Sequence, residues 1–353
     1  MPATQSLPRY DTSQTYRWNY EHAPQPVEGI DVPQIGGNWT YCGRPVASPL
    51  GIAAGPLLNG RWILYYAALG FDILTYKTTR GQARDCYPLP NLQPVESTGL
   101  SASGRELTAA SDMQGSWAVS FGMPSMSPDV WRADVEWTRS RLSKGKVLAV
   151  SVVASVEPNW SIDEIADDFA RCARWAVESG ADCIETNFSC PNVSTSDGQL
   201  YQQPAAAAIV AQRVRDAIGH VPYVIKVGFF DLPEQCEQLL DGVAPFATAL
   251  AMTNCIAATV ELPNGTKMFA GQPRGIGGES IRDASVAQVR RFAEIARQRG
   301  HATKFIGVGG ISSAAHVEQY LAAGAETVQL ATSPMINPLV AIEILSDLAR
   351  SHS

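Results

Sequence analysis

Short apolar runs alternate with amphipathic segments along most of this chain, and the alternation limits the folds that it can adopt. The apolar runs have the composition of buried strands, and the segments between them have the spacing of helices. Strands that alternate with helices form a parallel sheet, because each helix returns the chain to the edge where the next strand begins. The predicted strands are residues 48–55, 71–77, 147–155, 183–190, 223–228, 248–254, 304–311 and 327–333.

The predicted helices between these strands have recognisable ends. Ser161 is a good N-cap, Gly180 follows the last turn of the same helix, and Pro204 stands at the start of the next. Within residues 162–179 the apolar side chains fall on one face at helical spacing. The predicted helices are residues 61–70, 162–179, 204–218, 232–243, 284–299, 314–323 and 338–349.

About eight strand–helix units fit between residues 48 and 350, which is the number that a closed (β/α)8 barrel needs. A doubly wound Rossmann sheet is the rival fold, but no Gly-x-Gly-x-x-Gly pattern follows the first strand. We therefore predict an α/β fold, a (β/α)8 TIM barrel over residues 46–353 with loops inserted at its strand ends. An irregular N-terminal arm over residues 1–45 precedes it, with a short hairpin expected near residues 39–42.

Two stretches rich in glycine, proline and polar residues interrupt the alternation. Residues 81–135 are predicted to be irregular, and residues 263–278 form a second, glycine-rich insert. So long a structureless segment in a compact fold is usually functional. The arm of residues 1–45 is rich in aromatic residues, so it is either a surface wrap or a subunit contact.

Composition excludes several classes of protein. Of the 353 residues, 45% are hydrophobic and 17% are charged, which is typical of an ordered core rather than of disorder. A net charge of -7 without any basic run gives no nucleic-acid footprint. The sequence carries no recognisable signal peptide, and no apolar stretch reaches the ~18 residues of a membrane helix. We therefore expect a cytoplasmic protein with no nucleic-acid or membrane partner.

The seven cysteines are scattered, and none forms a Cys-x-x-Cys pair. Reduced thiols fit this pattern better than a disulfide framework, and an iron–sulfur or structural zinc site has little support. No metal site is therefore predicted. Five of the cysteines are interpreted as structural thiols: Cys42, Cys86, Cys172, Cys183 and Cys236.

The stretch Ile-Glu-Thr-Asn-Phe-Ser-Cys-Pro-Asn, residues 184–192, carries the most distinctive chemistry. An apolar strand ends there in two amides, Asn187 and Asn192, which bracket the thiol of Cys190. In a barrel of this kind, reactive groups stand at the carboxyl ends of the strands. Cys190 is therefore a candidate reactive thiol, and the alternative is a buried structural one.

Other strand ends supply further polar groups to the same opening. Lys226 lies in an apolar run, so it needs an anionic or electron-rich neighbour or a structural salt bridge. Gly309–Gly310 and Ala331–Thr332 stand after the last two strands, where such barrels commonly bind phosphate, although two ordinary tight turns are the alternative. The remaining strand-end residues are Ala54, Gly55, Lys77, Thr78, Thr253, Asn254 and Cys255.

Several of these pieces together resemble the dihydroorotate dehydrogenases and the related catalytic domain of dihydropyrimidine dehydrogenase. The resemblance extends over roughly residues 45–350, in the order that the family has. The matching pieces are Asn187-Phe188-Ser189-Cys190-Pro191-Asn192, Ile225-Lys226-Val227, Thr253-Asn254, Gly275-Ile276-Gly277-Gly278, Gly307-Val308-Gly309-Gly310-Ile311 and Gln329-Leu330-Ala331-Thr332.

The resemblance implies a flavoprotein that holds FMN over the mouth of the barrel. Its phosphate would lie on the two small-residue turns, and Lys226 would face the N1/O2 edge of the flavin. The cofactor-binding residues implied are Ala54, Gly55, Thr78, Asn187, Lys226, Gly277, Gly278, Gly309, Gly310, Ala331 and Thr332.

The same resemblance implies oxidation of dihydroorotate to orotate at a CH–CH bond, as in pyrimidine metabolism. Cys190 would be the catalytic base that removes a proton while the adjacent carbon gives a hydride to flavin N5. A cysteine at this position is similar to the soluble class of the family, and a homodimer is implied. The implied substrate-binding residues are Lys77, Asn187, Asn192, Asn254 and Cys255.

One departure leaves the substrate open. Val119 stands where the family usually has an asparagine that contacts the pyrimidine, and Trp117 and Phe121 indicate a more apolar pocket. The alternatives are the same flavin chemistry on a different cyclic substrate, including a reductase of specialised metabolism, or a barrel that binds a phosphate ligand without redox chemistry. The electron acceptor is also open among fumarate, a quinone, a nicotinamide reached through a partner subunit, and oxygen.

Overall fold

A closed barrel of eight parallel strands forms the centre of the computed structural model, which describes residues 7–189 and 196–351. The strands follow one another around the barrel in chain order, and the last pairs with the first, as predicted for a (β/α)8 barrel. The barrel strands are β3 (Leu50–Ile52), β4 (Ile73–Thr79), β8 (Val147–Val152), β9 (Cys183–Asn187), β10 (Tyr223–Lys226), β11 (Ala249–Met252), β14 (Lys304–Val308) and β15 (Thr327–Leu330).

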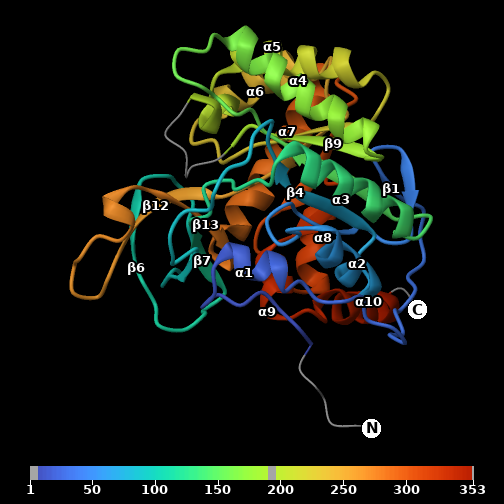
Figure 1. The fold of residues 1–353 in the computed structure, drawn as a ribbon, viewed down its shortest axis with the longest axis vertical. Helices are drawn as coiled ribbons and strands as arrows, with labels where there is room; N and C mark the ends of the chain where they lie inside the picture. The colour runs from blue at the N-terminus through green and yellow to red at the C-terminus, as the bar shows by residue number, and fades with distance from the viewer. Residues whose placement is uncertain (1–6, 190–195, 352–353) are drawn as a thin grey trace.

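Helices cover the outside of this barrel (Figure 1). The predicted helices begin and end within two residues of the expected positions. Ser161 accepts a hydrogen bond from the Glu164 N–H, and the Glu164 side chain accepts one from the Ser161 N–H, so a capping box starts α4. The helices are α2 (Gly60–Ala68), α3 (Pro128–Arg141), α4 (Ile162–Glu178), α5 (Pro204–Ile218), α6 (Pro233–Val243), α7 (Arg282–Arg299), α8 (Ala314–Ala322), α9 (Thr332–Ile336) and α10 (Val340–Ser351), with 3-10 turns η1 (Ser196–Gln202), η2 (Phe269–Gly271) and η3 (Glu279–Ile281).

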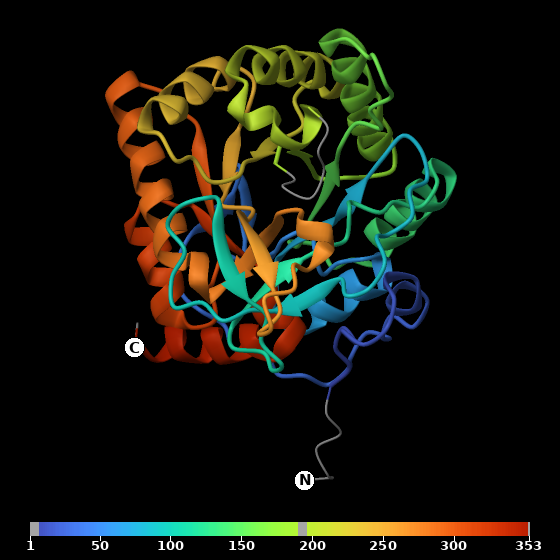
Figure 2. The ribbon, with the colours of Figure 1, turned by 90° about the vertical axis from the view of Figure 1, so that its left-hand side faces the viewer.

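The prediction that residues 81–135 are irregular is wrong in part. Three strands and the start of α3 lie in this segment, and with two later strands they form a second, five-stranded sheet in the order β5-β7-β13-β12-β6. Figure 2 shows this insert sheet in front of the barrel, inside the ring of helices. Its strands are β5 (Leu92–Pro94), β6 (Arg105–Thr108), β7 (Ser116–Val119), β12 (Ile256–Glu261) and β13 (Arg274–Gly278).

The N-terminal arm contains the expected hairpin, β1 (Trp39–Tyr41) paired with β2 (Arg44–Val46), and one unpredicted helix, α1 (Tyr16–Glu21). The hairpin inserts the fully buried Tyr41 into an apolar cluster with Ile73 and Cys183, so it closes the amino-terminal end of the barrel. The cysteines that the structure describes are free thiols, and those predicted to be structural are buried except Cys86, which is half-buried.

The barrel interior changes character from one end to the other. Next to the hairpin it is apolar, whereas toward the carboxyl ends of the strands it contains buried polar side chains. These are Thr75, Ser151, Glu185, Lys226 and Gln329. No helix in the described ranges is long and apolar enough to cross a membrane. The polar end of the barrel is the end that faces the insert sheet.

Candidate active site

One pocket lies between the carboxyl ends of the barrel strands and the insert sheet, and it gathers the strand-end residues singled out in the sequence. Cys190 and Asn192 lie outside the residues that the structure describes. Thr253 is fully buried behind the pocket. The predicted site residues that line the pocket are Ala54, Gly55, Lys77, Thr78, Asn187, Lys226, Asn254, Cys255, Gly277, Gly278, Gly309, Gly310, Ala331 and Thr332.

Two amide side chains orient each other at the pocket wall. Asn187 Oδ1 accepts a hydrogen bond from the Ser189 N–H at 3.1 Å and one from Asn254 Nδ2 at 3.4 Å. Asn254 also donates to the Ser189 carbonyl oxygen. Amides fixed in this way present a defined pattern of donors and acceptors, which is suited to recognising a polar ring.

Lys226 ends strand β10 at the floor of the pocket, directly beside Asn187 of β9 in the strand register. Only 5% of Lys226 is exposed. The nearby carboxyl group of Glu185 is fully buried, and burial raises its pKa while the Lys226 ammonium lowers it. The two side chains are therefore close enough for their charges to interact. No direct ion pair joins them among the described residues, so the structure does not show the structural salt bridge that was the alternative for Lys226.

Glycines give the pocket a flat opening. A side-chain carbon added at Gly55 would meet no atom within 4 Å, and one added at Gly277 would meet only Cys255 Sγ and Thr332 Oγ1 at 3.8 Å. Both positions line the pocket, so the missing side chains leave space inside it. A planar ring could therefore approach the backbone closely at these two positions.

Three further glycines shape the end of the pocket next to α8 and α9. Gly278, Gly309 and Gly310 have φ angles of 105°, 123° and 67°, a region that favours glycine. At Gly278 an added carbon would lie 2.2 Å from the Gly115 carbonyl oxygen, which requires that the side chain be absent. Tyr320 Oη donates to the Gly309 carbonyl oxygen at 2.7 Å and so fixes this turn.

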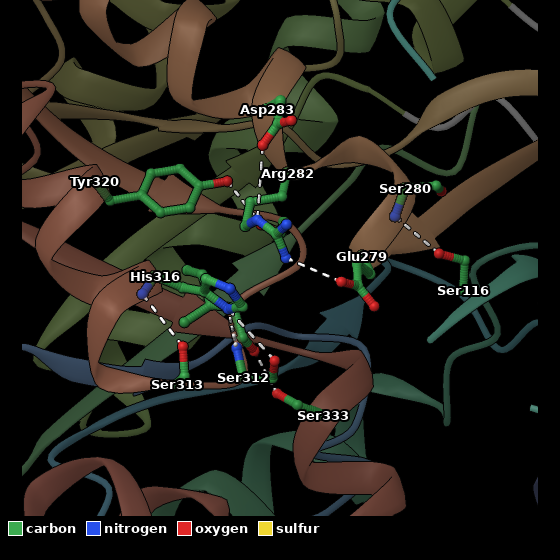
Figure 3. Close-up of polar contacts among 12 residues, drawn as sticks. Ser116, Glu279, Ser280, Arg282, Asp283, Ser312, Ser313, His316, Tyr320 and Ser333 are labelled. Atoms are coloured by element: carbon green, nitrogen blue, oxygen red, sulfur yellow. Dashed lines mark hydrogen bonds and ion pairs between the residues drawn. The ribbon is translucent and has the colours of Figure 1, made fainter. Parts of the chain in front are cut away.

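A cationic side chain lies beside the same turns (Figure 3). Arg282 Nη1 lies 3.4 Å from a carboxylate oxygen of Glu279, and Arg282 Nε lies 3.7 Å from one of Asp283. Below it, the Ser312 N–H donates to His316 Nδ1 at 3.3 Å. Burial and the neighbouring Arg282 lower the pKa of His316, which favours the neutral imidazole. Glycine turns beside a guanidinium are suited to an anionic group.

The insert sheet supplies an apolar wall opposite the polar floor. Val119 and Phe121 are part of this wall. The ring of Phe121 packs edge-on against Tyr10 and Tyr16 of the arm, with ring centroids 6.0 Å apart in both pairs. The arm therefore supports the pocket from outside. The apolar residues of the wall are Leu92, Trp117, Val119, Phe121 and Met123.

Sequence reasoning missed some residues at or beside the pocket. Leu92 and Met123 fall in the segment predicted to be irregular, and Gln329 belongs to a matching family motif but was given no role from the sequence. Arg282 directly follows the glycine-rich insert at the start of α7, and that position at a helix N-terminus is the only signal that could have found it. No group of three or more potential metal ligands occurs within residues 7–189 and 196–351.

Comparison with known proteins identifies the relatives of this chain. The sequence profile of the dihydroorotate dehydrogenase family matches residues 38–351. The chain belongs to the dihydroorotate dehydrogenase family. The members of this family are oxidoreductases, as their name states, and the match includes the whole barrel and the insert sheet.

Individual members of the dihydroorotate dehydrogenase family match over most of the chain. A dihydroorotate dehydrogenase of Dictyostelium discoideum is 30% identical, covering 95% of this chain and 96% of that protein. A quinone-type enzyme of Bordetella avium is 26% identical over 92% of this chain and 84% of that protein. The NAD(+)-type catalytic subunit of Bacillus cytotoxicus is 24% identical over 87% of this chain and 88% of that protein. Similarity to both types leaves the electron acceptor open.

The fold of the dihydroorotate dehydrogenase family is also found in the solved structures. The Eimeria tenella enzyme, solved in complex with ferulenol, superposes with a TM-score of 0.71 at 17% identity. The match covers 95% of this chain and 89% of that one. At this identity the likeness supports the barrel fold alone.

Proposed function

We propose that this protein is an FMN-dependent oxidoreductase that acts on a CH–CH bond of a dihydropyrimidine ring, with dihydroorotate as the first candidate substrate and orotate as its product. One observation carries the proposal. In a chain of this family, the strand-end residues inferred from sequence converge on a single pocket between the barrel and the insert sheet. Residues scattered over more than 270 positions would not line one cavity unless the fold brought them there.

The shape of the pocket fits the proposed cofactor. Gly55 and Gly277 leave an open, flat space that a planar ring system would fill. Gly309 and Gly310 would receive the phosphate. Arg282 lies beside them, with its charge partly balanced by Glu279 and Asp283. When bound, the flavin would supply an acceptor for the hydride removed from the substrate.

The residues around this space have separate proposed roles. Lys226 would hold a positive charge against the edge of the ring that becomes more negative on reduction. Asn187 and Asn254, already fixed by their mutual hydrogen bond, would bind the polar edge of the substrate, and Lys77 would bind its carboxylate. The insert sheet would exclude water from the reacting atoms.

Proton removal is assigned to Cys190, on sequence alone. The thiolate is the reactive form of cysteine, so the site would have to lower the pKa of Cys190 toward the working pH. The carbon–hydrogen bond next to the one that loses the hydride would give its proton to Cys190 Sγ, leaving a double bond in the ring. Asn192, from the same segment, would bind substrate beside it.

A second candidate function is the same chemistry on a different cyclic substrate, including its use as a reductase. The observation in its favour is the apolar wall of the pocket. Val119 lines the pocket among Trp117 and Phe121, so this side of the pocket offers apolar contact where a pyrimidine ring has polar groups. A site that lacks a hydrogen-bonding partner discriminates less strongly for a polar substrate.

An anaerobic visible spectrum tests both candidates. A yellow protein that bleaches on addition of dihydroorotate supports the first candidate. A yellow protein that dihydroorotate leaves oxidised retains the flavin and rejects the substrate, in favour of the second candidate. A colourless protein that FMN does not reconstitute contradicts both and favours a barrel that binds a phosphate ligand without redox chemistry. A cytoplasmic homodimer stays a prediction that gel filtration and cell fractionation would test.

A further inference from the structure

The floor of the pocket conceals a carboxyl group for which the proposed function has no role. Glu185 lies on β9 two residues before Asn187, and it is fully buried inside the barrel. Neither of its carboxylate oxygens has a hydrogen bond of normal geometry from any described residue. Leaving a buried carboxylate without such bonds is costly, so its position calls for an explanation.

The groups around Glu185 come from several elements. Ser151 of β8 lies directly opposite in the strand register, close enough to lower the pKa of Glu185, although its hydroxyl is already paired with Thr78. Lys226 of β10 is the charged group that most lowers that pKa, and Lys77 of β4 lines the pocket above.

The remaining titratable neighbours lie on the side of the hairpin. Tyr41 is fully buried, and burial together with nearby Cys183 and Cys42 raises its pKa well above the usual range, so it stays neutral. Cys183 lies on the same strand as Glu185, two positions earlier. Of the groups that face Glu185 across the barrel, Lys226 therefore carries the charge that matters most to it.

We propose that Glu185 is a positioning residue that opposes the charge of Lys226 at the pocket floor and thereby lowers the reduction potential of the flavin bound above it. This inference rests on the proposed function. Reduction adds negative charge to the flavin, which the Lys226 ammonium stabilises and a Glu185 carboxylate destabilises. In a buried site such charges interact strongly, because little solvent screens them.

The protonation state of Glu185 makes this effect depend on pH. Burial raises the pKa of Glu185, so the group is neutral at the acidic end of its titration and charged at the alkaline end. Only the charged form opposes flavin reduction. The wild-type potential should therefore fall more steeply with rising pH than that of a variant in which position 185 cannot ionise.

The experiment compares the reduction potential of bound FMN in the wild-type holoenzyme and in Glu185→Gln, across the pH range in which both are folded. The Gln variant should have the higher potential at alkaline pH, equivalent to about a tenfold larger equilibrium constant for reduction. The two potentials should converge toward acidic pH. Glu185→Met, with an apolar chain of similar length, should behave in the same way and serves if the Gln variant does not fold.

Thr327→Val is the matched control. Thr327 is also buried, on barrel strand β15, and its hydroxyl has no hydrogen-bond partner in the described part of the chain, but it carries no charge. This variant should retain the wild-type potential at every pH. A shift of the same size in Thr327→Val would assign the effect to disturbed packing and overturn the proposal.

Two further outcomes separate this inference from the proposed function. Equal potentials for wild type and Glu185→Gln at all pH values, or a lower potential in the variant, would overturn the role of Glu185 and leave the flavoenzyme intact. A wild-type protein that binds no FMN would overturn the proposed function and this inference together.

Discussion

The hydroxyl oxygens of Thr78 and Ser151 lie 3.0 Å apart and connect the pocket to the buried interior of the barrel. Thr78 lines the pocket, and Ser151 lies opposite Glu185 on the adjacent strand. The Glu185 carboxyl group, which solvent does not reach, therefore lies close behind the pocket lining, although it makes no hydrogen bond of normal geometry with Ser151. A substitution of Glu185 should therefore be detectable in the pocket, and a change in pH should change the charge of Glu185.

Glu185 should make the stability of the protein depend on pH even without a cofactor. Burial raises its pKa in the folded state above the value of about 4.3 in the unfolded chain. The loss of folding stability that the charge of Glu185 causes is therefore absent below the pKa of the unfolded state and complete above the pKa of the folded state. Relative to wild type, Glu185→Gln should gain stability as pH rises through that interval, by about 1.4 kcal/mol per unit of pKa shift.

Urea unfolding of the cofactor-free protein at several pH values measures this difference. A difference between variant and wild type that does not change with pH would contradict a raised pKa at Glu185.

Filling the flat part of the pocket should prevent cofactor binding without unfolding the protein. In Gly277→Val the new side chain points into open space, where an added carbon has no neighbour closer than 3.8 Å. We expect at least about a tenfold loss of FMN affinity, because the branched side chain takes the volume that the ring needs. Flavin fluorescence titration of the cofactor-free protein measures the affinity, and circular dichroism checks the fold.

Gly36→Ala is the control for that substitution, since Gly36 also has no atom within 4 Å of an added carbon but lies in the arm, outside the residues that line the pocket. It should bind FMN like the wild type. Unchanged affinity in Gly277→Val would show that the flavin, if it binds, lies elsewhere.

Cys190→Ala should slow flavin reduction by the substrate about 10²- to 10⁴-fold while FMN stays bound, because the substitution removes the proposed base. Anaerobic stopped-flow absorbance measures the rate of bleaching. Cys86→Ser provides a cysteine control, since Cys86 does not line the pocket and burial raises the pKa of its thiol to about 11. Equal rates in Cys190→Ala and wild type would assign proton removal to another group.

Val119→Asn tests which substrate the pocket fits. Val119 lies in β7 between Leu92 of β5 and Gly275 of β13. Backbone groups form these strand pairings, so a change of side chain at position 119 should leave the sheet intact. An added amide should improve the KM for dihydroorotate about tenfold, since a hydrogen bond to substrate contributes about 1–2 kcal/mol. Val119→Ala, which supplies no hydrogen-bonding group, should give no such gain. A weaker response of Val119→Asn to dihydroorotate would favour a ring with an apolar edge as the natural substrate.

The sequence alone determined the elements whose signals are local. Helix α5 has the predicted bounds, Pro204–Ile218, because proline at its start and glycine after its end act within a few residues. The eight barrel strands were predictable from their apolar runs, although all of them except β4, which extends to Thr79, end earlier than predicted. The strand-end residues of the candidate site followed from the same pattern, because parallel strands place their carboxyl ends together.

Only the tertiary structure decided the second sheet and the environment of the pocket floor. Strand β7 pairs with β13, where Trp117 meets Gly277 across a long separation in the chain, and short strands of that kind have no periodicity to reveal them. Glu185 was visible in the sequence as one polar residue in a strand. Its burial beside Lys226 arises from the closure of the barrel, because the burial and charge around a side chain depend on residues that are distant in sequence.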